Sequence, residues 1–308
     1  MARTNNLSNF LTDVADAIRT KKGSEELIAA ENFDTEIENL PSGADLSEYF
    51  NNTISENTST SFKFNVVKKV PDVVVENNVT KLEYLFYNYT MPSSIMNNLP
   101  KVICGNNVTS MYNMYYTNSK DTKITSIDIS GLDTSNVTTM SNMFKNRAGL
   151  VSLDFSNFDF SSLKTASSMF SYCEALTNLD LSKLIGTSFT TNSFGLEGAF
   201  EYCSSLRKID LSNFSPPVIY ARSMFYNCLK LEELDLDKWD LGTVGPALTN
   251  SMFSGCGSQL ENGAVTKVYV KDQAAQDWIL ALSSSNRPST WTTDNVIIAG
   301  SEADLRNA

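Results

Sequence analysis

The chain of 308 residues contains no histidine. This absence excludes the Ser-His-Asp and Cys-His arrangements of nucleophilic catalysis, and it removes the most common zinc ligand. The glycine-rich phosphate-binding signatures G-x-x-x-x-G-K-[S/T] and G-x-G-x-x-G are also missing, so nothing in the sequence supports nucleotide binding. We therefore predict no enzyme activity, no cofactor and no bound metal ion.

Basic residues are scarce, since 24 Lys and Arg against 35 Asp and Glu give a formal net charge of −11. This balance argues against nucleic-acid and anionic-membrane partners, whose phosphates attract basic side chains. No apolar run approaches the length of a transmembrane helix, and the N-terminus lacks the apolar stretch of a signal peptide. We expect synthesis in a host cytoplasm, no membrane insertion and no export by the usual signal route.

A repeated phrase dominates the sequence. It consists of apolar residues two positions apart with an Asp between them, and it occurs at residues 124–130, 150–156, 176–182, 206–212 and 231–237. Apolar residues at this spacing lie on one face of a strand, so Leu179 and Leu181 should face the core while Asp180 faces away. A fixed period predicts stacked units, each of which buries its apolar face only against its neighbours.

A second signal, an aromatic residue that usually follows Met, comes about fifteen residues after each strand phrase. Seven such aromatic anchors are spaced by 25 to 30 residues: Phe86, Tyr115, Phe144, Phe170, Phe200, Phe225 and Phe253. Before each anchor the apolar residues lie three or four positions apart instead of two, as at Val137, Met140 and Met143. This spacing predicts a short helix. Each of about seven units should therefore contain a short strand, a turn and one or two helical turns.

The strand phrase L-D-L-S, followed by N-V-T-x-M-x-x-M-F as at residues 136–144, resembles the BspA-like leucine-rich repeats of bacterial and phage surface proteins. The resemblance covers residues 70–270. It implies an α/β fold: a leucine-rich-repeat-like solenoid of parallel short strands plus short helices. It also implies a surface or binding role, but no particular ligand.

The N-terminal segment has apolar residues at helical spacing over residues 7–20, and a second short helix is predicted near residues 32–40. Residues 10–19 and 32–38 resemble the N-terminal module of tail and baseplate-associated structural proteins of phages and prophages of Gram-positive bacteria. The resemblance implies a virion anchor that binds other phage structural proteins. The side chains assigned to anchoring are Phe10, Leu11, Val14, Ile18, Phe33 and Ile37.

The predicted parts of the chain are a helical anchoring module at residues 1–45, a connector at 46–66, the solenoid at 67–271 and a C-terminal cap at 272–308. A solenoid needs a cap over its last apolar face. Residues 271–280 look helical, and residues 296–298 look like a last strand. The side chains suited to capping are Trp278, Ile279, Leu282 and Trp291.

The Asp residues of the strand phrases are predicted to form a row: Asp128, Asp154, Asp180, Asp210 and Asp235. Stacked parallel strands would hold these carboxylates about 5 Å apart, a separation compatible with a retaining glycosidase pair. Any in-register repeat produces the same spacing, so we favour a structural role in which each Asp accepts hydrogen bonds from nearby donors. Glycan cleavage and a row of calcium sites are the alternatives.

The strand positions beside the Asp row vary strongly between units while the apolar frame is maintained. We expect receptor contacts at these positions, although simple solvation is the alternative for each residue. The candidate receptor-binding residues are Thr177, Asn178, Arg207, Lys208, Glu232, Glu233 and Tyr269.

The five cysteines lack the C-x-x-C spacing of zinc sites. Four of them follow an aromatic anchor by three residues: Cys173, Cys203, Cys228 and Cys256. We favour a column of buried, reduced thiols over disulfide bonds between neighbouring units.

These features together predict a phage virion structural protein of the tail fibre or baseplate. Its repeats would be displayed to a host surface protein or glycan. The sequence does not decide the oligomeric state, and a homo-oligomer such as a trimer is compatible with it. A bacterial cell-surface adhesin of the same repeat family is the main alternative, and the lack of a signal peptide argues against it. A glycan-cleaving tail enzyme and a ligand-free decoration protein are lesser alternatives.

Overall fold

The structure is a computed structural model. It describes residues 53–54, 72–88, 99, 101–185, 195–215, 221–241 and 250–301. The predicted anchoring module, most of the connector and the insertion near residues 185–196 lie largely or wholly outside the described residues.

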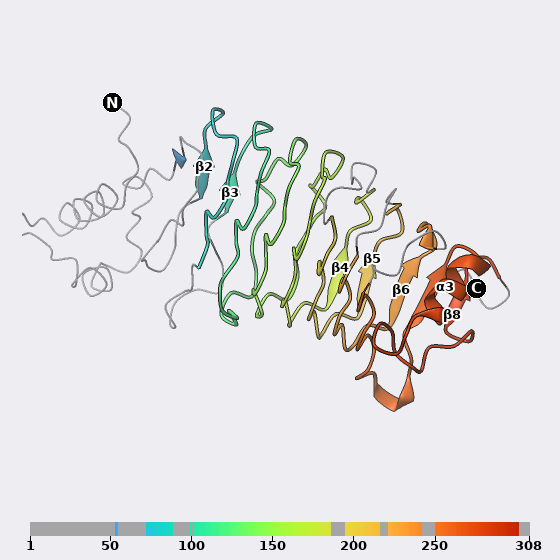
Figure 1. The fold of residues 1–308 in the computed structure, drawn as a ribbon. Coiled ribbons are helices and arrows are strands. Elements are labelled where there is room, and N and C mark those ends of the chain that lie inside the picture. The colour runs from blue at the N-terminus through green and yellow to red at the C-terminus, as the bar shows by residue number, and fades with distance from the viewer. Residues whose placement is uncertain are drawn as a thin grey trace, which may run out of the picture.

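The described strands are short and form two sheets (Figure 1). The first sheet contains β1 (Thr53–Ile54), β2 (Val73–Val75) and β3 (Val102–Ile103). The second contains β4 (Asn178–Asp180), β5 (Lys208–Asp210), β6 (Glu233–Leu236), β7 (Lys267–Val270) and β8 (Val296–Ile298). Every neighbouring pair is parallel. Parallel strands with few helices are compatible with the predicted α/β class.

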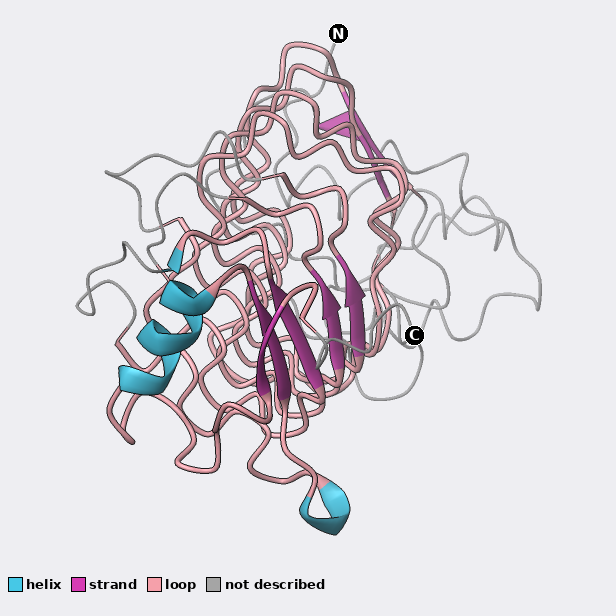
Figure 2. Ribbon diagram, turned by 90° about the vertical axis from the view of Figure 1, so that its right-hand side faces the viewer, coloured by secondary structure: helices cyan, strands magenta, loops and turns pink. Residues whose placement is uncertain are grey.

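Successive turns of the chain lie side by side along the long axis of the molecule, from β2 to β8 (Figure 1). Viewed from the end of the stack that carries β8, the strands of the second sheet lie side by side (Figure 2). Backbone hydrogen bonds join each repeat to the next with a constant offset: each anchor donates to the residue before the next anchor, Tyr115 to the carbonyl of Met143 and Phe144 to that of Met169, each at 2.9 Å. The repeats are therefore in register with one another.

The aromatic anchors form a continuous buried column through the stack. All seven side chains are at most 1% exposed. Adjacent rings are stacked nearly parallel, with centroids 5.3 to 6.1 Å apart and interplanar angles of 3 to 10°. This column confirms the anchors that the sequence predicts, and it forms the centre of the hydrophobic core.

The short helices predicted before the anchors are wrong. No α-helix occurs in the described parts of the repeats, residues 72–88, 101–185, 195–215 and 221–241. At residues 140–143 the N–H of Met143 donates to the carbonyl of Met140, and Asn142 between them has a φ of 57°. A positive φ at the third residue of such a turn is typical of type II geometry and interrupts a helix.

The stacking explains this difference. From Met140 to Asn146, every second N–H donates to the next repeat at 2.8 to 3.0 Å, and the N–H groups of Met143 and Lys145 between them each donate to a carbonyl three residues earlier. An α-helix would direct every N–H to a carbonyl four residues earlier and leave the neighbouring repeat without donors. Consecutive turns, instead of a helix, bring the apolar residues spaced by three and four to the core.

The C-terminal end of the stack contains a helix and a last strand, as the sequence predicts. Helix α3 (Gln273–Ala281) begins after Asp272, whose side chain accepts a hydrogen bond from the N–H of Ala275 at 2.9 Å. A 3-10 turn, η5 (Glu261–Gly263), precedes β7. Trp291 contacts the last anchor, Phe253, with ring centroids 5.2 Å apart. None of the helices in the described residues is long and apolar enough to span a membrane.

Candidate recognition surface

The Asp residues of the strand phrases lie on the outer side of the stack. Asp180 and Asp210 are register partners on β4 and β5, and both are exposed. Each of the five carboxylates accepts a hydrogen bond, at 2.8 to 3.0 Å, from the backbone N–H two residues later. The carboxylates therefore close Asx turns that end the strands.

The same hydrogen bonds lower the pKa of three of these carboxylates, those of Asp128, Asp154 and Asp180. Donation from the Ser130 side chain and backbone lowers the pKa of Asp128, and donation from Ser182 does the same for Asp180. A general acid of glycoside hydrolysis needs the opposite shift, a raised pKa. In the part of the chain that is described, no three Cys, Asp or Glu side chains gather as a metal site would require. The geometry of the Asp residues therefore favours the structural role over glycan cleavage and calcium binding.

The predicted receptor-binding positions form two adjacent rows on the strands. The candidates Asn178, Lys208 and Glu233 are register partners across β4 to β6, and Lys267 on β7, which is not among the predicted residues, continues the row. All of them except the half-buried Glu233 are exposed. Opposite charges face one another across this row, an arrangement that stabilises neighbouring strands.

The second row precedes the first by one position. Arg207 is exposed and forms an ion pair with the half-buried Glu232, and Thr177 beside them is half-buried. We call the two rows together the strand strip. It is a continuous solvent-facing surface of mixed charge.

Tyr269 departs from the sequence expectation. It is the register partner of Asp235 but is only 2% exposed. The last strand β8 pairs with β7 beside it, and Ile297 is its register partner. Because β8 pairs along β7, Tyr269 has a neighbouring strand on each side, and its burial prevents it from presenting its ring to a receptor.

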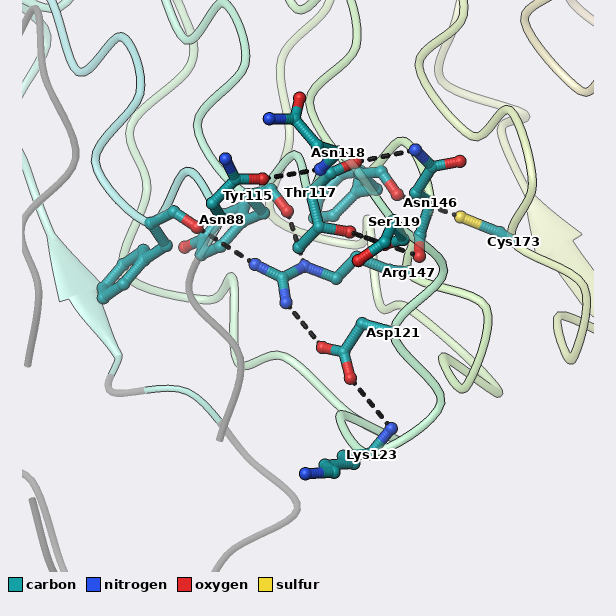
Figure 3. Close-up of polar contacts among 12 residues, drawn as sticks. Asn88, Tyr115, Thr117, Asn118, Ser119, Asp121, Lys123, Asn146, Arg147 and Cys173 are labelled. Atoms are coloured by element: carbon teal, nitrogen blue, oxygen red, sulfur yellow. Dashed lines mark hydrogen bonds and ion pairs between the residues drawn. The ribbon is translucent and has the colours of Figure 1, made fainter. Parts of the chain in front are cut away.

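A buried arginine lies in the third repeat, three residues after the anchor Phe144 (Figure 3). Arg147 donates from Nε to the carbonyl of Tyr115 and from Nη2 to the carbonyl of Phe86, the latter at 3.1 Å. Its Nη1 pairs with Oδ2 of Asp121 at 2.7 Å, and the two side chains are 0% and 2% exposed. Burial without access to solvent assigns this group to the stability of the stack and not to ligand binding.

Arg147 occupies the position that a cysteine occupies in later repeats, three residues after the anchor. The thiols of Cys173, Cys203 and Cys228 each donate to the carbonyl of the anchor in the previous repeat, at 3.1 to 3.2 Å. All five cysteines are unpaired and buried, which confirms the predicted thiol column. Burial raises the pKa of Cys256 to about 12, so these thiols are poor nucleophiles.

An open polar recess of about 550 Å³ lies where the Asn-Val-Thr segments of successive repeats meet. Its lining consists of Asn106, Asn107, Thr109, Asn136, Thr138, Ser161, Ser162 and Lys164. Several of these side chains already bond to the previous repeat. Thr138 donates to the carbonyl of Thr109 at 3.1 Å, and Asn136 donates to that of Asn106 at 2.9 Å. The recurring Asn and Thr therefore connect repeats.

Sequence reasoning missed a set of tyrosines beside the anchors. Seven half-buried tyrosines lie within three positions of an anchor: Tyr84, Tyr87, Tyr112, Tyr116, Tyr172, Tyr202 and Tyr226. Rings of neighbouring repeats contact each other at centroid distances of 4.4 to 5.6 Å. The recurrence of tyrosine one to three positions from the anchors could have predicted this set from the sequence. We call this set the tyrosine face.

Comparison with known proteins gives one match. A family model described as "Mycoplasma protein of unknown function, DUF285" matches residues 80–193 and 177–267, which together span more than half of the chain. The two matched segments coincide with the stacked repeats. Neither a curated protein nor a solved structure matches the chain.

Proposed function

The chain belongs to the DUF285 family of BspA-like repeat proteins. We propose that it is a phage tail-fibre or baseplate-associated protein whose repeats bind a receptor on the host surface. The observation that carries the proposal is the strand strip. It presents side chains that differ from repeat to repeat on a frame whose buried residues are explained by packing. Such an extended surface suits recognition.

The finer architecture that we propose is a leucine-rich-repeat-like solenoid of about seven units. The seven stacked anchors, the parallel pairing of all described strands and the regular backbone hydrogen bonds between neighbouring repeats support it. In such an arrangement each repeat contacts only its neighbours, so the exposed positions of one repeat can change without disturbing distant ones.

The virion assignment rests on the sequence of the N-terminal segment, residues 7–70, which resembles tail and baseplate modules. In this proposal residues 1–45 attach the chain to other phage structural proteins, and the repeats extend toward the host cell. A homotrimer would present three copies of the strand strip to one cell surface and raise the overall affinity by multivalency.

The second candidate is a bacterial cell-surface adhesin of the same repeat family. The description of the matched family as a Mycoplasma protein favours a cellular origin for such repeats. Mass spectrometry separates the two candidates. Under our proposal purified virions contain this chain in stoichiometric amounts, whereas its recovery in cell envelopes and not in virions would establish the adhesin.

A binding assay tests the receptor-binding role. Fluorescently labelled full-length chain should bind host cells, and Lys208→Gln combined with Lys267→Gln should weaken this binding about tenfold, which is a loss of about 1.4 kcal/mol. Both lysines are exposed, and glutamine places no like charge beside their register partner Glu233, so the double variant should lose less than about 1 kcal/mol of stability. Lys164→Gln, at the polar recess, is the control and should bind like the wild type. Equal binding by all three proteins would remove the strand strip from the proposal.

A further inference from the structure

One turn of the chain contains an asparagine that is followed directly by a glycine. Asn262 precedes Gly263, and no other asparagine of the 308 residues precedes a glycine. Both residues belong to η5, the turn between the last anchor and β7. Every residue from Glu261 to Ala264 is exposed, and the turn projects from the stack as the short cyan helix at the lower edge of Figure 2.

The backbone of this turn is left-handed at two consecutive positions. Asn262 has a φ of 56° and Gly263 has a φ of 72°. Apart from its chain neighbours, no atom lies within 4 Å of the place where a Cβ on Gly263 would be, so the space beside this residue is open. An exposed hydrogen bond from the N–H of Ala264 to the carbonyl of Glu261, at 3.1 Å, closes the turn. Water readily replaces an exposed bond of this kind, so the turn can open locally at small cost.

Five other asparagines share the left-handed conformation but lie inside the stack: Asn88, Asn113, Asn142, Asn146 and Asn227. The N–H of each donates to a carbonyl of the next repeat at 2.8 to 3.0 Å. Each also precedes a residue with a side chain, which shields the following backbone nitrogen. Within the described residues, no backbone hydrogen bond of residues 261–264 reaches a neighbouring repeat. The stacking therefore holds the backbone of these five asparagines but not that of Asn262.

We propose that Asn262 is a site of spontaneous deamidation. The backbone nitrogen of Gly263 gives up its proton to solvent base and attacks Cγ of Asn262. A bond forms between these two atoms, the bond from Cγ to Nδ2 breaks, and Nδ2 takes up a proton and leaves as ammonia. Water then opens the five-membered succinimide ring at either carbonyl and gives aspartate or isoaspartate. The reaction consumes water, releases ammonia and needs neither an enzyme nor a cofactor.

The geometry of the turn permits the ring closure. The nitrogen reaches Cγ only when rotation about the ψ of Asn262, which is 27° in the structure, brings the two atoms together. The exposed turn allows this rotation, and Gly263 has no Cβ to obstruct the approach. The same rotation at a stacked asparagine would break its hydrogen bond to the next repeat. Asparagine is one of the thermolabile residues of proteins, and this structure leaves the Asn-Gly pair without protection.

The products change the turn and leave the stack intact. Both carry a new carboxylate beside Glu261, and isoaspartate also lengthens the main chain by one methylene group. Because η5 contains no buried residue, neither product removes a packing contact from the core. We expect the modified chain to be more acidic than the unmodified chain and equally stable.

Peptide mapping by mass spectrometry tests the proposal on the purified full-length chain. Incubation in mildly alkaline buffer should convert Asn262 to aspartate and isoaspartate, and the isoaspartate should accept a methyl group from protein isoaspartate methyltransferase. The five stacked asparagines should stay unmodified. In chain unfolded with guanidinium chloride, the rate at Asn262 should change by less than about threefold, because its turn already opens freely. An Asn262 that stays intact in the folded chain, or a stacked asparagine that reacts as fast, would overturn the proposal.

Variants test the chemistry. Asn262→Gln keeps the amide but would have to close a six-membered ring, so position 262 should stay unmodified. Gly263→Ala places a Cβ beside the attacking nitrogen and should slow the conversion about tenfold. The matched control is Asn262→Asp, which carries the charge of the product and should have the unfolding midpoint of the wild type. Conversion of Gly263→Ala at the wild-type rate would contradict attack by the nitrogen of residue 263. These readouts use purified chain alone, so they are independent of the strand strip and of the virion assignment.

Discussion

Arg147 shows how a single residue adapts a repeated frame. In later repeats a cysteine thiol satisfies the carbonyl of the preceding anchor, but positions 89 and 118 hold Tyr and Asn. Arg147 reaches two anchor carbonyls at once, those of Tyr115 and Phe86. The cost is a fully buried charge, which Asp121 compensates at 2.7 Å. Removal of either partner leaves the other charge buried and unpaired.

We therefore predict that Arg147→Ala lowers the free energy of unfolding by about 3–5 kcal/mol, as expected for breaking a buried ion pair. Urea denaturation followed by circular dichroism measures this loss. The matched control is Arg207→Ala, which removes the exposed ion pair with Glu232 and should change stability by less than about 1 kcal/mol. Similar losses in the two variants would show that burial does not govern the contribution of Arg147.

At the scale of the element, the unit of this fold is a pair of consecutive turns around each anchor. The residue two positions before every anchor has a positive φ. These residues are Tyr84, Asn113, Asn142, Ser168, Gly198, Ser223 and Ser251. Because alternate N–H groups of the turns donate to the next repeat, the backbone conformation and the stacking stabilise each other.

The turn geometry can be tested at Asn142, whose φ is 57°. Glycine adopts this conformation without strain, whereas a side chain with a Cβ and no compensating polar group costs about 1–2 kcal/mol there. Asn142→Ala should therefore be less stable than Asn142→Gly by about this amount. Thermal unfolding of the two variants measures the difference. A more stable alanine variant would instead indicate the helix that the apolar spacing suggested.

At the scale of the whole molecule, the stack has ends that must be closed. The aromatic column ends at Phe253, which contacts Trp291, and β8 pairs with the free edge of β7. In a stack whose repeats contact only their neighbours, an uncovered last repeat exposes apolar surface and promotes association. Trp291 is 2% exposed, while Trp278 on α3 is partly exposed.

Trp291→Ala should consequently destabilise the C-terminal end by about 3–5 kcal/mol. Trp278→Ala, the matched change in a less buried tryptophan, should have a smaller effect. Hydrogen exchange read by mass spectrometry localises the loss. We expect faster exchange in β6, β7 and β8 for Trp291→Ala, with residues 101–150 unaffected. Uniform acceleration along the chain would mean that the stack unfolds as one unit.

The amino-acid sequence by itself determined the period, the seven anchors, the buried faces of the strand phrases, the thiol column and the terminal helix and strand. These features depend on which residues are apolar, and the apolar pattern directly reports which face is buried. For the same reason the Asp positions could be assigned to the outer face before the structure was known.

Only the tertiary structure decided the rest. The turns replace helices because N–H groups are shared with a neighbouring repeat, which a local pattern does not contain. Tyr269 is buried on β7, whose edge pairs with the last strand β8. The partners of Arg147 lie 26 to 61 residues away, and the tyrosine face assembles from separate repeats. These contacts are made by residues distant in sequence, so they exist only once the repeats are stacked.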